Sequence, residues 1–515
     1  MELAIRNLNN VVKETDFLLP YIFTENKNLL TENASLKERL ESSEKINNLL
    51  REQIRLSNQR QFGKKSETSN QLGLPLFDEN EQEEQPQEEI KTEKISYTRR
   101  KKAVGRKIDT SKLPREQIIH DITEEEKRCE HCGKELEKIG EERSEQLEHI
   151  PAQLKVIEHI KLKYTCRCCG TIKTGKKPES PLPKSMAGSS LIAEVIIKKY
   201  EHHLPWYRQS KIFAHEGIDI PPNTIGNWFM QSGLILLPLK QALWQEINKI
   251  DVLQADETTV KVLDKNIKGY MWAYNSCVPT NRFILFEYND SRKGEVVNKS
   301  LENYRGILQT DGYSGYNKLR NKEEVISVGC WAHCRRKFID VIKLSSKTGT
   351  AHEIVGLIRK LYQIEDEARK SKLDFNDRKE LRQTAKPILE KIHTCLIKAH
   401  PPPDSALGRA IKYGLNQWEY LTKYINYGQV EIDNNWVENQ IRPFALGRKN
   451  WLFTGNELAA QNAAFFYSLI QTCRLNNIDP RKYLIYVLNK AGAMRRKEID
   501  PKILLPQFID KNLLE

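Results

Sequence analysis

Apolar and polar residues begin to alternate after Ile250, with the period of two residues that is typical of half-buried β-strands. In the stretch "DVLQADETTVKVL", one face of the predicted strand carries Val252, Gln254, Asp256, Thr258, Val260 and Val262. Two further stretches, "KGYMWAYNSC" and "NRFILFEY", follow at short intervals. The pattern therefore predicts three antiparallel strands.

The elements that come next predict that this sheet is mixed. "GEVVNKSLENY" has the pattern of a helix, and "GILQTDGYSGY" that of a strand ending at Asp311. Three strands, a helix and a further strand indicate an α/β sheet of ribonuclease H type, in which the fourth strand lies beside the first. Asp256 and Asp311 would then lie together, an inference that rests on topology and not on spacing.

Helical periodicity dominates on both sides of this sheet. Residues 190–245 are predicted to be helical, with a turn at Gly217 and a second helix that starts near Asn223. This is compatible with a helix-turn-helix whose groove-facing residues would be Asn223, Thr224 and Asn227. A helical hairpin that binds nothing fits equally well. Residues 341–430 are also largely helical, which predicts an inserted subdomain.

A heptad pattern near the N-terminus, between Ile22 and Ser57, predicts a leucine-zipper-like coiled coil. Ile22, Leu29, Leu36 and Leu50 occupy d positions, and Asn26, Asn33, Leu40, Asn47 and Ile54 occupy a positions. Asparagine at a positions costs stability but fixes register, which favours a parallel homodimer or a higher oligomer. A single amphipathic helix packed on its own protein is the alternative.

The charge of the chain indicates what kind of partner it binds. Its net charge of +13 over 515 residues favours a polyanion, of which nucleic acid is the leading candidate. A Gln-, Glu- and Ser-rich linker, predicted to be disordered, precedes a basic segment. This segment contains Arg99, Arg100, Lys101, Lys102, Arg106 and Lys107. It would follow a phosphate backbone or enter a minor groove, although a solvated charge run is an equal alternative.

Two CxxCG motifs indicate a structural zinc site. They supply the four thiolates of Cys129, Cys132, Cys166 and Cys169, which suit one tetrahedral Zn²⁺, and alternation between them suggests a zinc ribbon. Buried or redox-active thiols are the alternative. No apolar run of about 18 residues and no signal-peptide pattern is present. We therefore expect a cytoplasmic protein with no membrane partner.

Glu438 lies in the predicted helix of "EIDNNWVENQIRPFALGRKNWLFTG". Alone, it suits an ordinary helix that Asp433 caps and in which Glu438 pairs with Arg442. Neighbouring carboxylates such as those predicted for Asp256 and Asp311 repel each other unless a proton or cation separates them. Two Mg²⁺ ions in such a site support phosphoryl transfer, and Glu438 is the candidate third ligand. Taken one at a time, Asp256 is explained as an ordinary strand-edge carboxylate and Asp311 as an ordinary turn residue, and neither interpretation requires a bound metal.

Four stretches carry a resemblance to a known family: "QADETTVKV", "LQTDGYSGYN", "GCWAHCRRKF" and "DNNWVENQIRPFALGRKNWLF". With the zipper, the "CEHCG" motif and the C-terminal "NIDPRKYLIYVLN", the sequence resembles the transposases of the bacterial insertion-sequence family numbered sixty-six, which belong to the DDE superfamily. The resemblance covers nearly the whole chain. It implies a nucleoid-associated bacterial enzyme that binds the element's terminal repeats and target DNA, with possible element-encoded accessory proteins as partners.

By this resemblance, Asp256, Asp311 and Glu438 form the DDE triad that holds Mg²⁺ or Mn²⁺, two ions per site. Two nearby motifs are candidate DNA contacts. "CWAHCRRKF", which matches a Cys-x-x-His signature of the group, and the region of "GRKNW" would supply His333, Arg335, Arg336, Arg442, Arg448, Lys449 and Trp451. Core packing of Trp331, Phe338 and Trp451 is the alternative for these motifs.

The sequence thus predicts a multidomain α and β protein whose central activity is metal-dependent DNA cleavage and strand transfer. A catalytically inactive or repurposed zinc-containing DNA-binding protein and a nuclease that only hydrolyses DNA are the rivals. The predicted parts are a coiled coil (1–66), a disordered linker with the basic segment (67–108), a zinc ribbon (109–180), a helical region (181–245), a ribonuclease H-like domain with a helical insertion at about 341–430 (246–475), and a helical tail (476–515).

Overall fold

The structure is a computed structural model, and it divides the chain into two compact units. One unit combines Met1–Leu74 with Ile157–Glu515, and the other is Pro75–Val156. The residues that the structure describes are 31–37, 40, 44, 154–165, 172–175, 179–183, 185–277, 282–344 and 349–514. Most of the predicted coiled coil, the linker, the basic segment and the four zinc ligands therefore lie outside the described residues.

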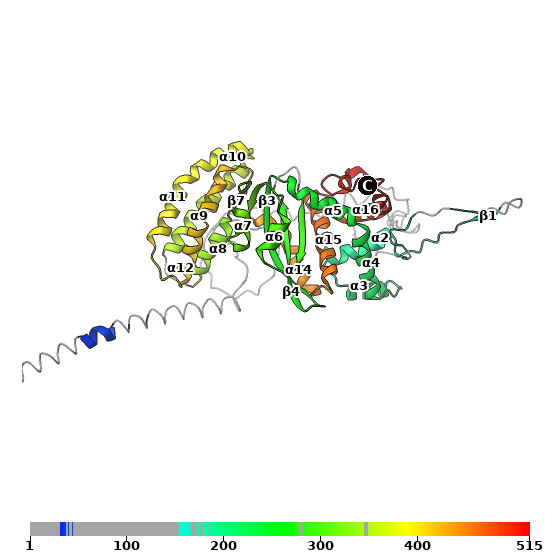
Figure 1. Cartoon of the computed structure of the whole chain (residues 1–515), viewed down its shortest axis with the longest axis horizontal. Coiled ribbons are helices and arrows are strands. Elements are labelled where there is room, and N and C mark those ends of the chain that lie inside the picture. The colour runs from blue at the N-terminus through cyan, green and yellow to red at the C-terminus, as the bar shows by residue number, and fades with distance from the viewer. Residues whose placement is uncertain are drawn as a thin grey trace, which may run out of the picture. The chain divides into compact units, whose positions relative to one another are not determined.

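A five-stranded mixed sheet forms the centre of the larger unit (Figure 1). Its strands are β3 (Val252–Val262), β4 (Ile267–Ser276), β5 (Ile284–Asn289), β6 (Gly306–Gln309) and β7 (Val325–Val328). Their spatial order is β5-β4-β3-β6-β7, with β3, β4 and β5 antiparallel and β6 and β7 parallel to β3. The fourth strand of the sheet thus pairs with the first, as the sequence predicted.

Helix α15 (Glu457–Leu475) covers the β5 edge of the sheet. The backbone N–H groups of Ile284 and Phe286 donate to the hydroxyls of Thr472 and Ser468, at 3.1 and 2.8 Å. These hydroxyls satisfy donors that an open edge strand would leave for another chain. Strand β4 on one side and helix α15 on the other therefore flank β5, with no sixth strand in the described sheet.

One hydrophobic core joins the sheet to the helices that precede and follow it. The preceding helices are α2 (Ser189–Tyr200), α3 (Trp206–His215), α4 (Pro222–Ile235) and α5 (Leu237–Glu246), and the following one is α16 (Pro480–Arg495). Tyr200, Phe229 and Tyr467 are in ring contact within this core. The region predicted as a C-terminal tail is also part of the core, because α16 packs on α2 and Leu505 is fully buried.

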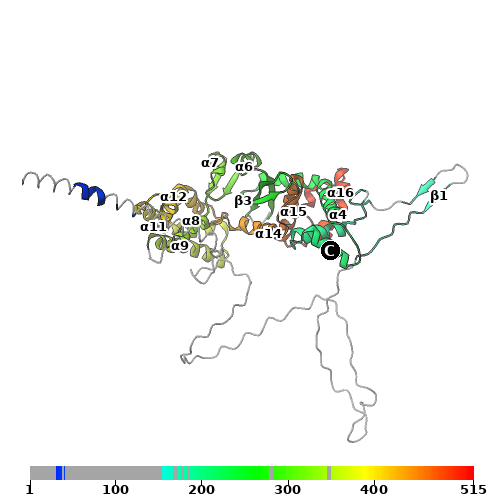
Figure 2. The ribbon, with the colours of Figure 1, turned by 90° about the horizontal axis from the view of Figure 1, so that it is seen from below.

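The predicted helical insertion is present between β7 and the helix that carries Glu438. It contains α8 (Trp331–Ile342), α9 (Thr350–Lys370), α10 (Phe375–Arg382), α11 (Lys386–Lys398), α12 (Ala406–Asn416), α13 (Trp418–Thr422) and the 3₁₀ turn η5 (Lys423–Asn426). In Figure 2, as in Figure 1, these helices lie on the side of the sheet away from α2, α4 and α16. The chain then returns to the sheet through α14 (Asn435–Trp451).

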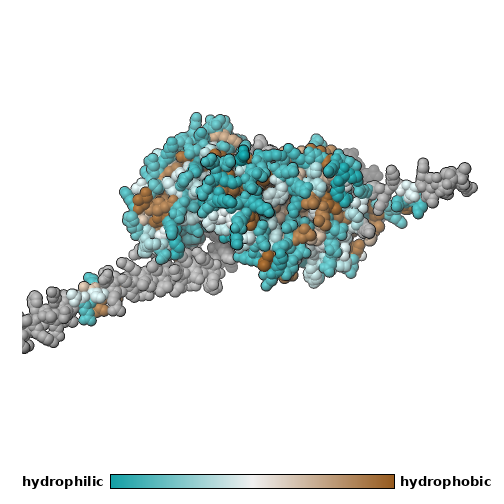
Figure 3. Space-filling view, in the orientation of Figure 1, coloured by the Kyte–Doolittle hydropathy of each residue, from teal (hydrophilic) through white to brown (hydrophobic). Residues whose placement is uncertain are grey.

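The remaining described elements are small. A hairpin of β1 (Lys163–Thr165) and β2 (Ile172–Thr174) pairs antiparallel, and residues 31–37 are helical with exposed side chains. The face drawn in Figure 3 is mostly hydrophilic with separate hydrophobic patches. Among the described residues, no helix has the length and apolarity needed to span a membrane.

Candidate active site

Strands β3 and β6 hold Asp256 and Asp311 side by side. The two strands pair in parallel with Gln254 opposite Gln309, and each aspartate follows two residues later. The Asp256 Oδ1 accepts a hydrogen bond from the backbone N–H of Glu257 at 2.8 Å, and the Asp311 Oδ1 accepts one from Tyr313 N–H at 2.9 Å. Because side chains two residues apart in a strand share a face, Asp256 lies on the face of Gln254. Asp311 follows directly after the end of β6, and its charge acts on Asp256.

Helix α14 brings Glu438 to the same face. The backbone N–H of Val437 donates to Gln254 Oε1 at 3.1 Å, which fixes the first turn of α14 over β3. The Glu438 Oε1 is buried and has no hydrogen-bond partner. His333 Nδ1 lies 3.7 Å from that oxygen, and Arg336 Nη2 lies 3.6 Å from Oε2. A buried carboxylate oxygen without a hydrogen bond is costly unless another group, such as a cation, contacts it.

The pKa of Asp256 also favours a cation at this site. Burial raises the pKa of Asp256 well above its usual value, and the charges of Glu257, Glu438 and Asp311 raise it further, against a lowering by the hydrogen bond from Glu257 N–H. A bound cation would offset this repulsion and stabilise the ionised form. Within the described part of the chain, however, no three His, Cys, Asp or Glu side chains are already arranged as a metal cage.

Glu257, the other acid of the strand, faces the opposite side of the sheet, as the alternation predicted. Its Oε1 lies 2.6 Å from Arg292 Nη2, and its Oε2 accepts a hydrogen bond from the hydroxyl of Tyr316 at 3.1 Å. The charge of Glu257 still acts on Asp256, but its carboxylate oxygens are engaged away from α14. Glu257 therefore does not compete with Asp256 for a place beside Glu438.

The Cys-x-x-His motif connects α8 to the start of α14. The thiol of Cys330 donates to Asn434 Oδ1 at 2.9 Å, and His333 Nδ1 lies 3.3 Å from the Cys330 sulfur. Burial raises the pKa of Cys330 well above its usual value, so its thiol is protonated at neutral pH. Burial also lowers the pKa of His333, although the charges of Glu438 and Asp311 oppose this shift. A neutral thiol in this position acts as a structural hydrogen-bond donor.

Comparisons with known proteins match three successive parts of the chain. The family model described as "Transposase IS66 family" matches residues 184–462. A model for the zinc-finger binding domain of transposase IS66 matches 126–170, and one described as "Transposase C of IS166 homeodomain" matches 49–118. The chain belongs to the IS66 family of transposases.

Curated relatives of this transposase come from Sinorhizobium fredii. The uncharacterized protein y4jD is 33% identical over 397 residues, which cover 73% of this chain and 77% of y4jD. The uncharacterized protein y4hP is 31% identical over 422 residues, which cover 76% of this chain and 75% of y4hP. These relatives extend the resemblance along the chain, and their names assign no further activity.

Two of the residues predicted to contact DNA in the transposase are buried in the structure. Arg335 is only 5% exposed, so its guanidinium is not presented to a phosphate at the surface. Trp451 is 6% exposed and packs in the core with its ring 5.5 Å from that of Phe444, which leaves no free face for a base. The burial of Arg335 and Trp451 favours the core-packing alternative, because an amphipathic helix turns one face toward the core, and a contact of either residue with DNA stays a prediction.

The other predicted contacts on α8 and α14 of the transposase are at least partly exposed. Arg336, Arg442 and Lys449 are exposed, whereas Arg448 is half-buried. Arg448 donates to Thr258 Oγ1 at 3.1 Å and Thr259 Oγ1 at 2.9 Å, so it joins the end of α14 to β3. "GRKNW" is thus the last part of α14.

Helices α3 and α4 of the transposase form the predicted pair, with Gly217 at a positive φ of 88° in the connection. Asn223 and Asn227 are exposed one turn apart on α4, and Thr224 is half-buried. Their role in DNA binding stays a prediction. Arg99, Arg100, Lys101, Lys102, Arg106 and Lys107, and the cysteines Cys129, Cys132, Cys166 and Cys169, lie outside the described residues.

Sequence reasoning missed the two glutamines behind the aspartates. Gln254 Nε2 donates to Gln309 Oε1 at 2.9 Å, and both side chains are fully buried. The sequence did contain a signal, because "LQAD" and "LQTD" place the same Leu-Gln-x-Asp pattern before each acid. A buried glutamine that recurs at matching positions of two adjacent strands indicates a paired amide network.

Proposed function

We propose that this transposase cuts and joins DNA ends at a site built from Asp256, Asp311 and Glu438. The observation that supports it most is that β3, the end of β6 and the first turn of α14 each supply an acid, and that the charges of Glu438 and Asp311 act on Asp256. We assign the sheet, with its order β5-β4-β3-β6-β7, to the ribonuclease H type. These hard oxygen donors suit Mg²⁺ or Mn²⁺.

Asp256, Asp311 and Glu438 would hold two such ions. When bound, the ions favour the ionised attacking oxygen and stabilise the leaving oxygen of a phosphodiester. The lack of a hydrogen bond to Glu438 Oε1 and the raised pKa of Asp256 fit a site that is complete only with a cation. Because the three carboxylates are not arranged as a cage, their side chains would converge when the cation enters.

The reaction has two chemically similar steps. A water oxygen attacks the phosphorus at the element end, a P–O bond to the 3′ oxygen breaks, and a 3′-hydroxyl is released. That hydroxyl then attacks a target phosphodiester, so one P–O bond forms and one target 3′-hydroxyl leaves. Neither step needs a covalent protein intermediate.

Several other groups of this chain would position the DNA. Arg336 is half-exposed beside Glu438 and would contact a phosphate next to the reacting one. The zinc-finger segment with Zn²⁺ on its four cysteines, the basic segment and the α3–α4 pair would bind the terminal repeats. A dimeric N-terminal helix would bring two element ends together.

The test is a Mg²⁺-dependent cleavage and joining assay on labelled DNA from both flanks of the gene. The native protein should give joined products, whereas Asp256→Asn and Asp311→Asn should give neither cleavage nor joining while they retain DNA binding. Joining by Asp311→Asn would contradict the proposal. Cleavage without joining by the native protein would favour the nuclease that only hydrolyses, and binding without cleavage would favour the inactive DNA-binding protein.

A further inference from the structure

The segment 424–434, which leads from the helical insertion into α14, is held by buried arginines. Arg382 of α10 is fully buried and donates to the backbone carbonyls of Tyr424, Tyr427 and Val430 at 3.0, 2.6 and 2.8 Å. Its other hydrogen bonds go to both carboxylate oxygens of Glu365 on α9, at 2.7 and 2.8 Å. Two helices of the insertion thus fix the path of this segment.

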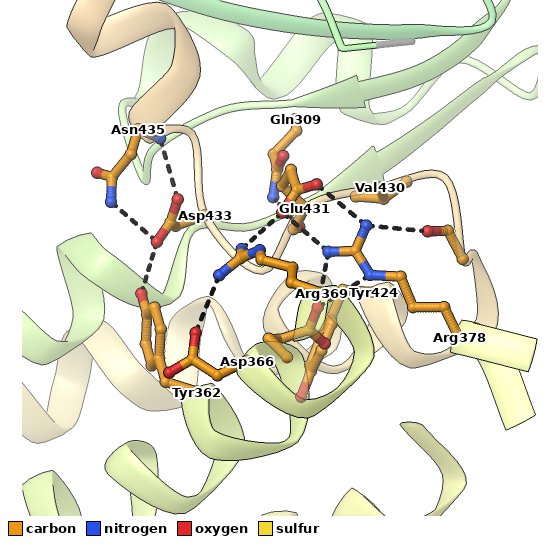
Figure 4. Close-up of polar contacts among 12 residues, drawn as sticks. Gln309, Tyr362, Asp366, Arg369, Arg378, Tyr424, Val430, Glu431, Asp433 and Asn435 are labelled. Carbon is orange, nitrogen blue, oxygen red and sulfur yellow. Dashed lines mark hydrogen bonds and ion pairs between the residues drawn. The ribbon is translucent and has the colours of Figure 1, made fainter. Parts of the chain in front are cut away.

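Two acids of the same segment point back to the insertion (Figure 4). Arg378 donates to Glu431 Oε1 and Oε2 at 3.0 and 2.8 Å, and Arg369 donates to Oε2 at 2.9 Å. Burial alone would raise the pKa of Glu431, but the hydrogen bonds and charges of these arginines lower it to about 2. The hydroxyl of Tyr362 donates to Asp433 Oδ2 at 2.8 Å.

The opposite side of the segment is bound to the two catalytic strands. Gln309 Nε2 donates to the carbonyl of Glu431 at 2.7 Å, and Gln254 Nε2 donates to that of Asp433 at 2.8 Å. Gln254 and Gln309 are themselves hydrogen-bonded, and Gln254 also accepts from Val437 N–H. The chain of bonds therefore starts in the insertion and ends one residue before Glu438.

We propose that the helical insertion is a positioning device for Glu438, which it holds against Asp256 and Asp311 through Glu431, Gln309 and Gln254. The proposal rests on the proposed function, because it concerns the placement of a metal ligand. An insertion with a purely structural role would need contacts only with the rim of the sheet. Here the arginines bind three carbonyls and the Glu431 side chain of the segment 424–434 from one side, and the two glutamines bind the carbonyls of Glu431 and Asp433 from the other.

The experiment uses the full-length, zinc-loaded protein and follows Mn²⁺ binding by electron paramagnetic resonance, so its readout does not depend on activity. Glu431→Gln keeps the side-chain shape but removes the charge that Arg378 and Arg369 contact. We expect it to weaken Mn²⁺ binding about tenfold or more, which is the usual scale for loss of a group that orients a ligand. Hydrogen exchange of residues 431–440 should become faster, whereas exchange in β3 and β4 should not change.

The matched control is Glu201→Gln. Glu201 accepts two hydrogen bonds from Arg474, at 2.6 and 3.1 Å, and its side chain is 17% exposed against 13% for Glu431. It lies at the end of α2 and contacts no part of the segment 424–434 in the structure described. Its loss should lower thermal stability as Glu431→Gln does, but it should leave Mn²⁺ binding unchanged.

A second variant guards against a general loss of structure in Glu431→Gln. Gln309→Met has a similar volume but donates no hydrogen bond to the Glu431 carbonyl, and it should also weaken Mn²⁺ binding. Native Mn²⁺ affinity in both variants would overturn the positioning role. If Asp256→Asn also binds Mn²⁺ normally, the ligand assignment of the proposed function fails and this inference fails with it. If Asp256→Asn loses Mn²⁺ and both positioning variants keep it, only the inference fails.

Discussion

Arg382 provides the sharpest test of how the insertion is held to the rest of the protein. Its guanidinium is fully buried and donates to two carboxylate oxygens and three carbonyls. Arg382→Met preserves much of the side-chain length but removes every one of these hydrogen bonds. Glu365 keeps its contact with Arg378. The carbonyls of Tyr424, Tyr427 and Val430 lose their arginine donor, but those of Tyr424 and Tyr427 still accept from a backbone N–H, so Val430 is the one left without a donor among them.

The expected cost follows from these contacts. Removing one partner of a buried ion pair costs about 3–5 kcal/mol, and each buried carbonyl left without a donor costs about 1–3 kcal/mol. Because part of Glu365 stays paired and water can reach a loosened segment, we expect a loss on the order of 4 kcal/mol. That is a large part of the roughly 5–15 kcal/mol that stabilises a typical protein.

The assay is unfolding in urea, monitored by hydrogen exchange. This method measures the opening of the insertion and the opening of the sheet separately. Arg382→Lys should lose less stability than Arg382→Met, because lysine keeps the positive charge. It should still be less stable than the native protein, because lysine has three hydrogen-bond donors in place of five. Lys423→Met, which breaks the exposed pair with Glu419, should cost at most about 1 kcal/mol. If Arg382→Met costs no more than Lys423→Met, the reasoning about the buried network is wrong.

Three further predictions follow from the described contacts. Burial raises the pKa of Asp433 from 3.8 to about 6, so the folded state keeps a proton that the unfolded chain releases near pH 4. The contribution of Asp433 to the free energy of unfolding should therefore fall by about 3 kcal/mol as pH rises from about 4 to 6. In urea titrations Asp433→Asn should remove this part of the pH dependence, and an unchanged dependence would contradict the raised pKa. Gly447→Ala should lower the free energy of unfolding by about 1–3 kcal/mol in the same assay, since a Cβ there would lie 2.6 Å from Tyr467 Oη. An unchanged free energy of unfolding would show that the neighbouring side chains move to make room for the methyl group. Arg448→Ala should speed hydrogen exchange at the C-terminal end of α14 by freeing it from Thr258 and Thr259, and unchanged exchange would contradict that link.

The sheet could be predicted from the sequence because each strand carries its own local signal. The alternation in residues 252–262 identified β3 and the face of Asp256, and the order of strands and helix indicated that β6 would pair with β3. The helical insertion was predictable for the same reason, since helix periodicity is local. Together these features were enough to place Asp256 and Asp311 side by side.

Contacts between residues far apart in the chain could not be predicted in this way. "FNDRKELR" looks like a solvated charged helix, yet Arg378 and Arg382 are buried because Glu365 and the segment 424–434 enclose them. The burial of Trp451 likewise depends on Tyr467 of α15, whose ring contacts that of Phe444 beside Trp451. Such partners are set by tertiary packing, which a single sequence does not encode in any local pattern.

Strand joining by the Glu438→Gln variant, measured with Mg²⁺ and labelled DNA from both flanks, decides whether Glu438 belongs to the catalytic site. The change keeps the size of the side chain but removes the charge beside Asp256. The control is Glu419→Gln, whose carboxylate is exposed on α13. We predict joined products from the native protein and from Glu419→Gln, with none from Glu438→Gln. Joining by Glu438→Gln at the native rate would contradict the assignment of the three carboxylates to one catalytic site.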